Sequence, residues 1–219
     1  MVAIDSAFVA PRDTRITTTH TGQFVLFAAL CAALLAAASL AIAPEGAGWR
    51  TAAEMVTRFS LLVFGAAMVV EPLSRLMPLP ATQALAKERG GLMLAFAIVS
   101  FMALGCMYAP ARLSAEHLTA PAIAYMGLTS LVLMVLLFSS HPATIRVLTA
   151  PVWRSLQRIA TAYFWLSFLL VGFDHLIGPH KPDGWYGFSV LFLVAILLIR
   201  FADAFVAHLL ARNPTRQAA

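Results

Sequence analysis

The stretch FDHLIGPHK, residues 173–181, places one acid and two histidines where a long apolar run ends. These side chains are Asp174, His175 and His180. Imidazole and carboxylate groups bind several transition metals, and imidazole is a common axial ligand of haem iron. His117, in a loop expected on the same side, is a further candidate ligand. Two interpretations stay open: a shallow metal or haem-ligand site with His175 deepest, or polar residues capping helix ends in contact with water and headgroups.

The amino-acid composition indicates whether water or lipid surrounds most of the chain. Of 219 residues, 61% are hydrophobic and 11% are charged, whereas a soluble domain carries about 25% charged residues. Six apolar stretches each reach the roughly 20 residues that cross a bilayer core. They lie at about 21–43, 51–73, 90–111, 118–140, 157–177 and 184–206. The sequence therefore predicts an all-α polytopic protein, a six-helix transmembrane bundle over 21–210 between tails at 1–20 and 211–219.

The first stretch raises the question of a cleaved signal peptide. Its uncharged region is longer than the roughly 7–15 residues of a signal peptide's apolar region, so we expect a retained span. Cys31 and Cys106 both lie within apolar runs, and we interpret them as buried thiols rather than a disulfide or a redox pair.

The basic residues predict the orientation of the bundle, because Lys and Arg concentrate in cytoplasmic loops. We expect both termini in the cytoplasm, since one side carries ten such residues and the other three. The inner group is Arg12, Arg15, Arg75, Lys87, Arg89, Arg146, Arg154, Arg158, Arg212 and Arg216, and the outer group is Arg50, Arg112 and Lys181. The net charge of +5 thus reflects topology, and the partner it indicates is the lipid bilayer, not nucleic acid.

Polar residues inside the spans are costly in lipid and are functional candidates. On the fifth span, Tyr163, Ser167 and Asp174 share one helical stripe,. Gln157 and His175 share another, about 27 Å apart at about 1.5 Å per residue. Three charge pairs have i,i+4 or i,i+3 spacing and are expected to neutralise themselves near an interface. They are Glu54 with Arg58, Glu71 with Arg75, and Arg200 with Asp203.

Several motifs, in order, resemble the ferric-reductase-like transmembrane family over about 52–201. The second span ends in VVEPLSRLMPLP, and LAKERGGLMLAFAIVSFMAL leads into the third. LLFSSHPATIRVLTAPVWRSLQRIATAY is similar to the family's fourth-span exit, loop and fifth span. HLIGPHKPDGWYGFSVLFLVAILLIRF is similar to its outer loop and sixth span. The branch most similar to this chain is the haem-binding membrane subunit of bacterial periplasmic methionine sulfoxide reductase systems.

The resemblance implies transmembrane electron transfer through haem b, held by histidines on the third and fifth spans. This chain departs from that pattern at two positions. Gln157 stands where the family has its first fifth-span histidine, and the third span offers Ser100, Phe101 and Met102 in place of its histidine. His175, six residues before Lys181, is the candidate counterpart of the second fifth-span histidine. The cofactor-binding candidates are therefore His175, Gln157 and His117, and the metal candidates are His175, His180 and Asp174.

Two functions are compatible with this pattern. In one, the chain is a bacterial inner-membrane protein that transfers electrons through haem b or a quinone together with a protein partner. In the other, it is an accessory or structural subunit of a larger membrane complex that has lost the redox centre. No flavin- or nucleotide-binding domain is visible in the sequence, so electrons would come from a partner or from a quinol.

Overall fold

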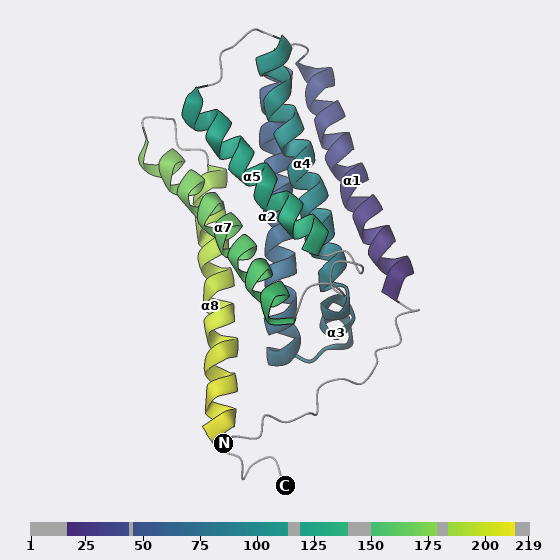
Figure 1. The fold of residues 1–219 in the computed structure, drawn as a ribbon, viewed down its shortest axis with the longest axis vertical. Coiled ribbons are helices and arrows are strands. Elements are labelled where there is room, and N and C mark those ends of the chain that lie inside the picture. The colour runs from purple at the N-terminus through teal and green to yellow at the C-terminus, as the bar shows by residue number, and fades with distance from the viewer. Residues whose placement is uncertain (1–16, 44–45, 114–118, 140–149, 179–183, 213–219) are drawn as a thin grey trace.

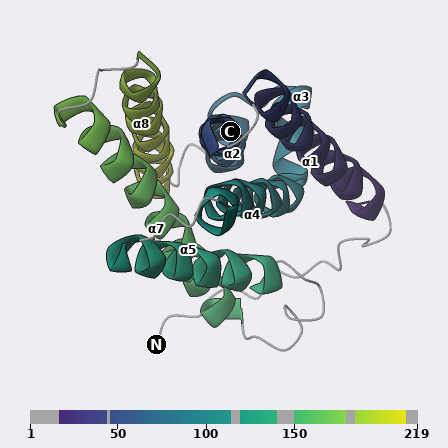
Figure 2. The ribbon, with the colours of Figure 1, turned by 90° about the horizontal axis from the view of Figure 1, so that it is seen from above.

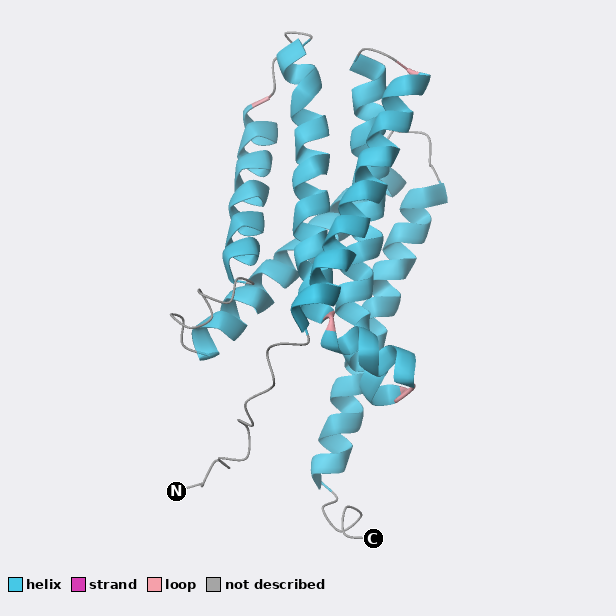
Figure 3. Ribbon diagram, turned by 90° about the vertical axis from the view of Figure 1, so that its right-hand side faces the viewer, coloured by secondary structure: helices cyan, strands magenta, loops and turns pink. Residues whose placement is uncertain are grey.

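The structure, a computed structural model, describes residues 17–43, 46–113, 119–139, 150–178 and 184–212. Across these residues the chain forms helices joined by short connections, and no strand is present (Figures 1 and 3). The helices are α1 (Thr17–Ile42), α2 (Gly46–Leu76), α3 (Pro80–Lys87), α4 (Arg89–Leu113), α5 (Ala120–Ser139), α7 (Ala150–Ile177) and α8 (Gly184–Arg212).

Six of these helices, all except α3, are long and apolar enough to cross a membrane. The predicted all-α polytopic bundle is therefore confirmed. Several helices extend beyond the predicted spans, so that α1 begins inside the region expected as an N-terminal tail and α8 ends just inside the C-terminal one. The Thr17 end of α1 and the Arg212 end of α8 lie at the same end of the bundle (Figure 1). We call this the predicted inner end.

The bundle is organised around α2 and α4, which share the most extensive contact of any helix pair among the described residues. Seen from above, α1 lies on one side of this pair, and α5, α7 and α8 lie on the other (Figure 2). α2 contacts α1, α4 and α8, whereas α7 contacts α5 and α8. Every remaining span thus reaches the central pair directly or through one neighbour.

Four phenylalanines from three helices fill the centre of the bundle. Phe64 on α2 and Phe96 on α4 are fully buried, and their ring centroids are 5.0 Å apart. Phe164 on α7 lies edge-on to Phe96 at 4.9 Å, and Phe168 lies 5.8 Å from Phe64. Such ring pairs contribute about 0.5–1.5 kcal/mol each beyond their buried area. We call these four residues the phenylalanine cluster.

α1 joins the central pair through small side chains. Ala28 and Ala32 on α1 are buried against Ala95 and Ala103 on α4, with Val56 of α2 beside them. Small residues let helix backbones approach closely, and van der Waals packing of this kind drives helix association in lipid.

α3 is a short helix that sequence reasoning assigned to a loop. It begins with Pro80, a residue favoured at the first helical position, and Leu79 precedes it in an extended conformation. The Thr82 hydroxyl donates hydrogen bonds to the carbonyls of Met77 and Leu79 at 2.8 and 2.9 Å. Leu85 packs against the bundle core. α3 therefore closes the predicted inner end between α2 and α4.

Charged side chains link three helices at the predicted inner end. Glu71 on α2 accepts from Arg75 at 2.5 Å, as its i,i+4 spacing predicts, and from Arg89 at the start of α4. Arg75 also reaches Asp203 on α8 at 3.2 Å. Asp203 is therefore bound across helices by Arg75. Arg200 acts on Asp203 through its charge, but among the described residues the direct ion pair of Asp203 is with Arg75.

Arg200 instead donates to the thioether sulfur of Met68 on α2, at 3.3 Å. One turn of helix α8 thus contributes two separate contacts to α2, one ionic and one to sulfur. The result is that α2, α4 and α8 are fixed in register at this end.

We predict that Gly65→Leu destabilises the bundle. A Cβ at Gly65 would lie 2.3 Å from the Phe192 ring of α8, and overpacking of this kind costs about 1–3 kcal/mol. Gly105→Leu is the matched control, because a Cβ there meets nothing within 4 Å and the gain in helix propensity is the same. A melting temperature for Gly65→Leu as high as that of the control would contradict the close α2–α8 approach.

Candidate functional site

A cavity of about 220 Å³ opens between α2, α7 and α8, away from the predicted inner end. Its walls combine charged, aromatic and apolar side chains. They are Glu54, Thr57, Arg58, Leu61, Met107, Phe168, Val171, Gly172, His175, Trp185, Tyr186 and Ser189. We call this space the outer cavity.

Arg58 is the central cation of the outer cavity. It follows Glu54 by one helical turn, so both side chains lie on the same face of α2, and their charged atoms are 3.9 Å apart. The predicted pairing is therefore present. The guanidinium also lies over the Trp185 and Tyr186 rings of α8, at 5.4 and 5.9 Å from their centroids. These distances are within the range of cation–π attraction, so Arg58 joins α2 to α8 as well as meeting Glu54.

His175 lies in the last turn of α7 and lines the outer cavity, as its place in the sequence suggested. Its Nδ1 is 3.0 Å from the carbonyl oxygen of Val171, one turn earlier. With Nδ1–H as the donor, Nε2 is the unprotonated nitrogen of the neutral ring. The ring stacks on Tyr186, with centroids 4.0 Å apart and planes at 17°. The imidazole is thus held in one orientation by α7 and α8 together.

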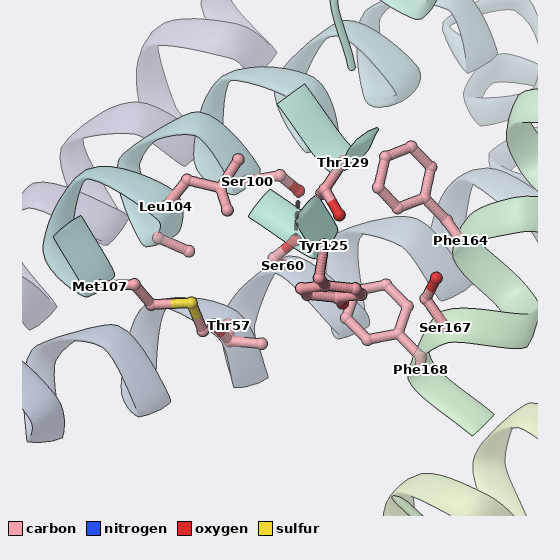
Figure 4. A pocket seen from close by; sticks show the side chains of 11 residues that line it. Thr57, Ser60, Ser100, Leu104, Met107, Tyr125, Thr129, Phe164, Ser167 and Phe168 are labelled. Atoms are coloured by element: carbon pink, nitrogen blue, oxygen red, sulfur yellow. Dashed lines mark hydrogen bonds between the residues drawn. The ribbon is translucent and has the colours of Figure 1, made fainter. Parts of the chain in front are cut away.

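A second, smaller cavity of about 50 Å³ lies deeper, among α2, α4, α5 and α7. Side chains from all four helices converge on it (Figure 4). Its walls include Thr57, Met107 and Phe168, which also line the outer cavity. The remaining lining residues are Ser60, Ser100, Ala103, Leu104, Tyr125, Thr129, Phe164 and Ser167. We call this space the inner cavity.

Of the other residues predicted to form the site, the two that the structure describes do not join His175 at the outer cavity. Asp174 is exposed and lines neither cavity, and half-buried Gln157 lies about 27 Å along α7 from His175,. His117 and His180 lie outside the described residues. Within the described ranges, no three His, Cys, Asp or Glu side chains are grouped closely enough to hold a metal ion.

Sequence reasoning missed the α8 side of the outer cavity. Trp185, Tyr186 and Ser189 were seen only as part of a family motif, yet they form one wall. The signal was the pair of adjacent aromatic residues at the start of a span, where Trp and Tyr commonly face the membrane interface. Their packing against His175 and Arg58 depends on tertiary structure and is not visible in the pattern.

Haem b fits neither the centre of the bundle nor the outer cavity. The phenylalanine cluster occupies the space between α4 and α7, the two helices that would supply imidazole ligands. In the outer cavity, Met107 and His175 form a possible ligand pair on the walls. However, a cavity of about 150 Å³ holds a single benzene ring, and 220 Å³ has no room for the four pyrrole rings of a porphyrin.

No protein-family model, curated protein or solved structure matches this chain. The ferric-reductase-like assignment therefore stays a prediction from the motifs.

We predict that the protein expressed with ample haem shows no haem α band. The measurement is the absorption spectrum of the purified protein, oxidised and then reduced with dithionite. An α band that His175→Ala removes would contradict the fit argument above. His208→Ala is the control for this variant, because exposed His208 lies on α8 near its C-terminal end and lines neither cavity.

Proposed function

We propose that this chain is a membrane-embedded electron-transfer subunit that binds a quinone or quinol headgroup in the outer cavity. The observation that carries the proposal is the meeting of Arg58, Glu54 and His175 with the Trp185 and Tyr186 rings around one ring-sized space. A quinone needs this combination, because it is a flat apolar ring with two opposed oxygen atoms that accept hydrogen bonds or carry protons.

The size of the outer cavity supports a single substituted ring. Its 220 Å³ exceeds the roughly 150 Å³ that accommodates benzene. Ligand pockets are mostly apolar with a few polar groups that fix orientation, and Leu61, Phe168 and Val171 supply the apolar part here. The surrounding helices are apolar spans, so an isoprenoid tail would remain in lipid.

The polar groups of the outer cavity match the two oxygens of the headgroup. The Arg58 guanidinium is a permanent donor, and the Tyr186 hydroxyl donates as well. In the tautomer with Nδ1–H bound to Val171, the Nε2 of His175 accepts a proton. Glu54, with its side chain 56% exposed, is a second proton acceptor in contact with solvent.

Oxidation of a bound quinol would release two electrons and two protons. The protons pass to His175 and Glu54, and the electrons pass to a redox protein partner that acts as the oxidant. Without that partner the chain binds the headgroup and does no net chemistry. The phenylalanine cluster favours this haem-independent function over a transmembrane haem chain.

The same cluster also favours a second candidate, an accessory subunit of a membrane complex with no redox centre of its own. In that case Arg58, Glu54 and His175 hold α2, α7 and α8 together and take no ligand. Quinone binding separates the two candidates.

We predict saturable quenching of tryptophan fluorescence when a short-tailed benzoquinone is added to the purified protein. Trp185 lines the outer cavity, so Trp185→Phe should remove most of the saturable component. Arg58→Gln should weaken binding by at least about tenfold, because a hydrogen bond to a charged group contributes about 1.5–3 kcal/mol and about 1.4 kcal/mol is a factor of ten.

Gln157→Asn is the control, since Gln157 lies on α7 but lines neither cavity. It should bind the quinone like the unaltered protein. Quenching that rises linearly and equally in all four proteins would reflect partition into the detergent or lipid, and would favour the accessory subunit.

We further propose a bacterial inner-membrane location with both termini in the cytoplasm. The imbalance of basic residues supports this orientation. A reporter enzyme active only in the periplasm, fused after Ala219, should give no signal, whereas the same reporter inserted after Pro182 should give a strong one. The reverse pattern would contradict the orientation without affecting the fold.

A further inference from the structure

The inner cavity is lined by an unusual number of hydroxyl groups for the middle of a membrane bundle. Thr57, Ser60, Ser100, Tyr125, Thr129 and Ser167 all face it (Figure 4). Ser60, Ser100 and Thr129 are buried, and each lies near the middle of its helix. Polar groups at this depth are costly unless they are hydrogen-bonded.

Protein partners satisfy only part of this hydroxyl set. Ser60 and Ser100 are bonded to each other at 2.7 Å, and Thr129 is bonded to Tyr163 at 2.8 Å. The Tyr125 hydroxyl is also hydrogen-bonded to Thr129 and Ser167. Each hydroxyl has one donor and two acceptor positions, so these groups retain bonding capacity. The Oγ1 of Thr57 is buried and, among the described residues, has no hydrogen-bond partner.

The space beside these hydroxyls is large enough for water. A water molecule needs about 10–15 Å³ of such volume and two to four polar partners, so 50 Å³ admits about three molecules. We propose that the inner cavity is a hydration site that holds a short chain of ordered water, anchored by Thr57, Ser100 and Ser167.

The hydration site adjoins the outer cavity. Thr57, Met107 and Phe168 line both spaces, so in this proposal water enters beside Arg58 and Glu54. Phe164 and Phe168 also line the inner cavity, and their contacts with Phe96 and Phe64 fill the bundle centre next to it. This inference requires no quinone and stands apart from the proposed function.

Thiol hydrogen exchange tests the hydration directly. In a Cys31→Ser, Cys106→Ala background, Ser100→Cys places one S–H group in the inner cavity. On transfer to D2O its infrared S–H band should disappear at least tenfold faster than that of Ala97→Cys. Ala97 is the matched control, one turn away on α4 and fully buried against the phenylalanine cluster. Equal rates for the two thiols would overturn the proposal. Ser167→Cys, on α7, repeats the test from another helix if Ser100→Cys does not fold.

The stability of Thr57→Val supplies a second, independent result. Valine has nearly the shape of threonine but cannot bond to water. If water satisfies the Thr57 hydroxyl, the substitution removes a hydrogen bond and should lower the melting temperature. If the cavity is dry, it removes an orphaned polar group, and the melting temperature should rise or stay the same. A rise or no change would overturn the assignment of Thr57 as an anchor.

Discussion

The phenylalanine cluster is the interaction on which the rest of the structure depends. A lipid solvent provides no hydrophobic drive for helix association, so shape and specific contacts must decide which helices meet. Four rings from α2, α4 and α7, with centroids 4.9–6.5 Å apart, provide that shape. They also divide the bundle. Each end of the bundle is held by its own set of contacts among the described residues.

The two ends differ in how they use charge. At the predicted inner end, Glu71 is bound by two arginines and Asp203 by one of them, so these charges link helices to one another. At the opposite end, Arg58 meets Glu54 at 3.9 Å and two aromatic faces at longer range. Such contacts are weaker than a bidentate ion pair. The Arg58 side chain also lies on the wall of the outer cavity.

The fold class could be predicted from the sequence because the length and hydropathy of each span depend only on that span's own residues. All six spans were located, with the largest difference at the start of the fifth, which was predicted at residue 157 and begins as a helix at Ala150. α3 was not predicted because an eight-residue helix is too short to show the apolar length of a membrane span, although Pro80 marked its start. Arg200 and Asp203 were paired by spacing, but the nearer cation in space is Arg75 from α2. Interhelical partners depend on the rotation of each helix about its axis, which spacing within one helix does not determine.

In the candidate site, too, the sequence predicted the position of a residue along its own helix but not its neighbours from other helices. His175 was identified from its position at the end of an apolar run, and it does line the outer cavity. Asp174, its sequence neighbour, points away because consecutive helical residues diverge by about 100°. The functional neighbours of His175 come instead from α8, where Tyr186 stacks on its ring, and from α2, where Arg58 lies over the same tyrosine. A histidine held between two helices is a better candidate for chemistry than a histidine at a helix rim, since its orientation is fixed before any ligand arrives,. Whether FDHLIGPHK takes part in chemistry therefore depends on the cavity that His175 lines, and not on the number of histidines in the stretch.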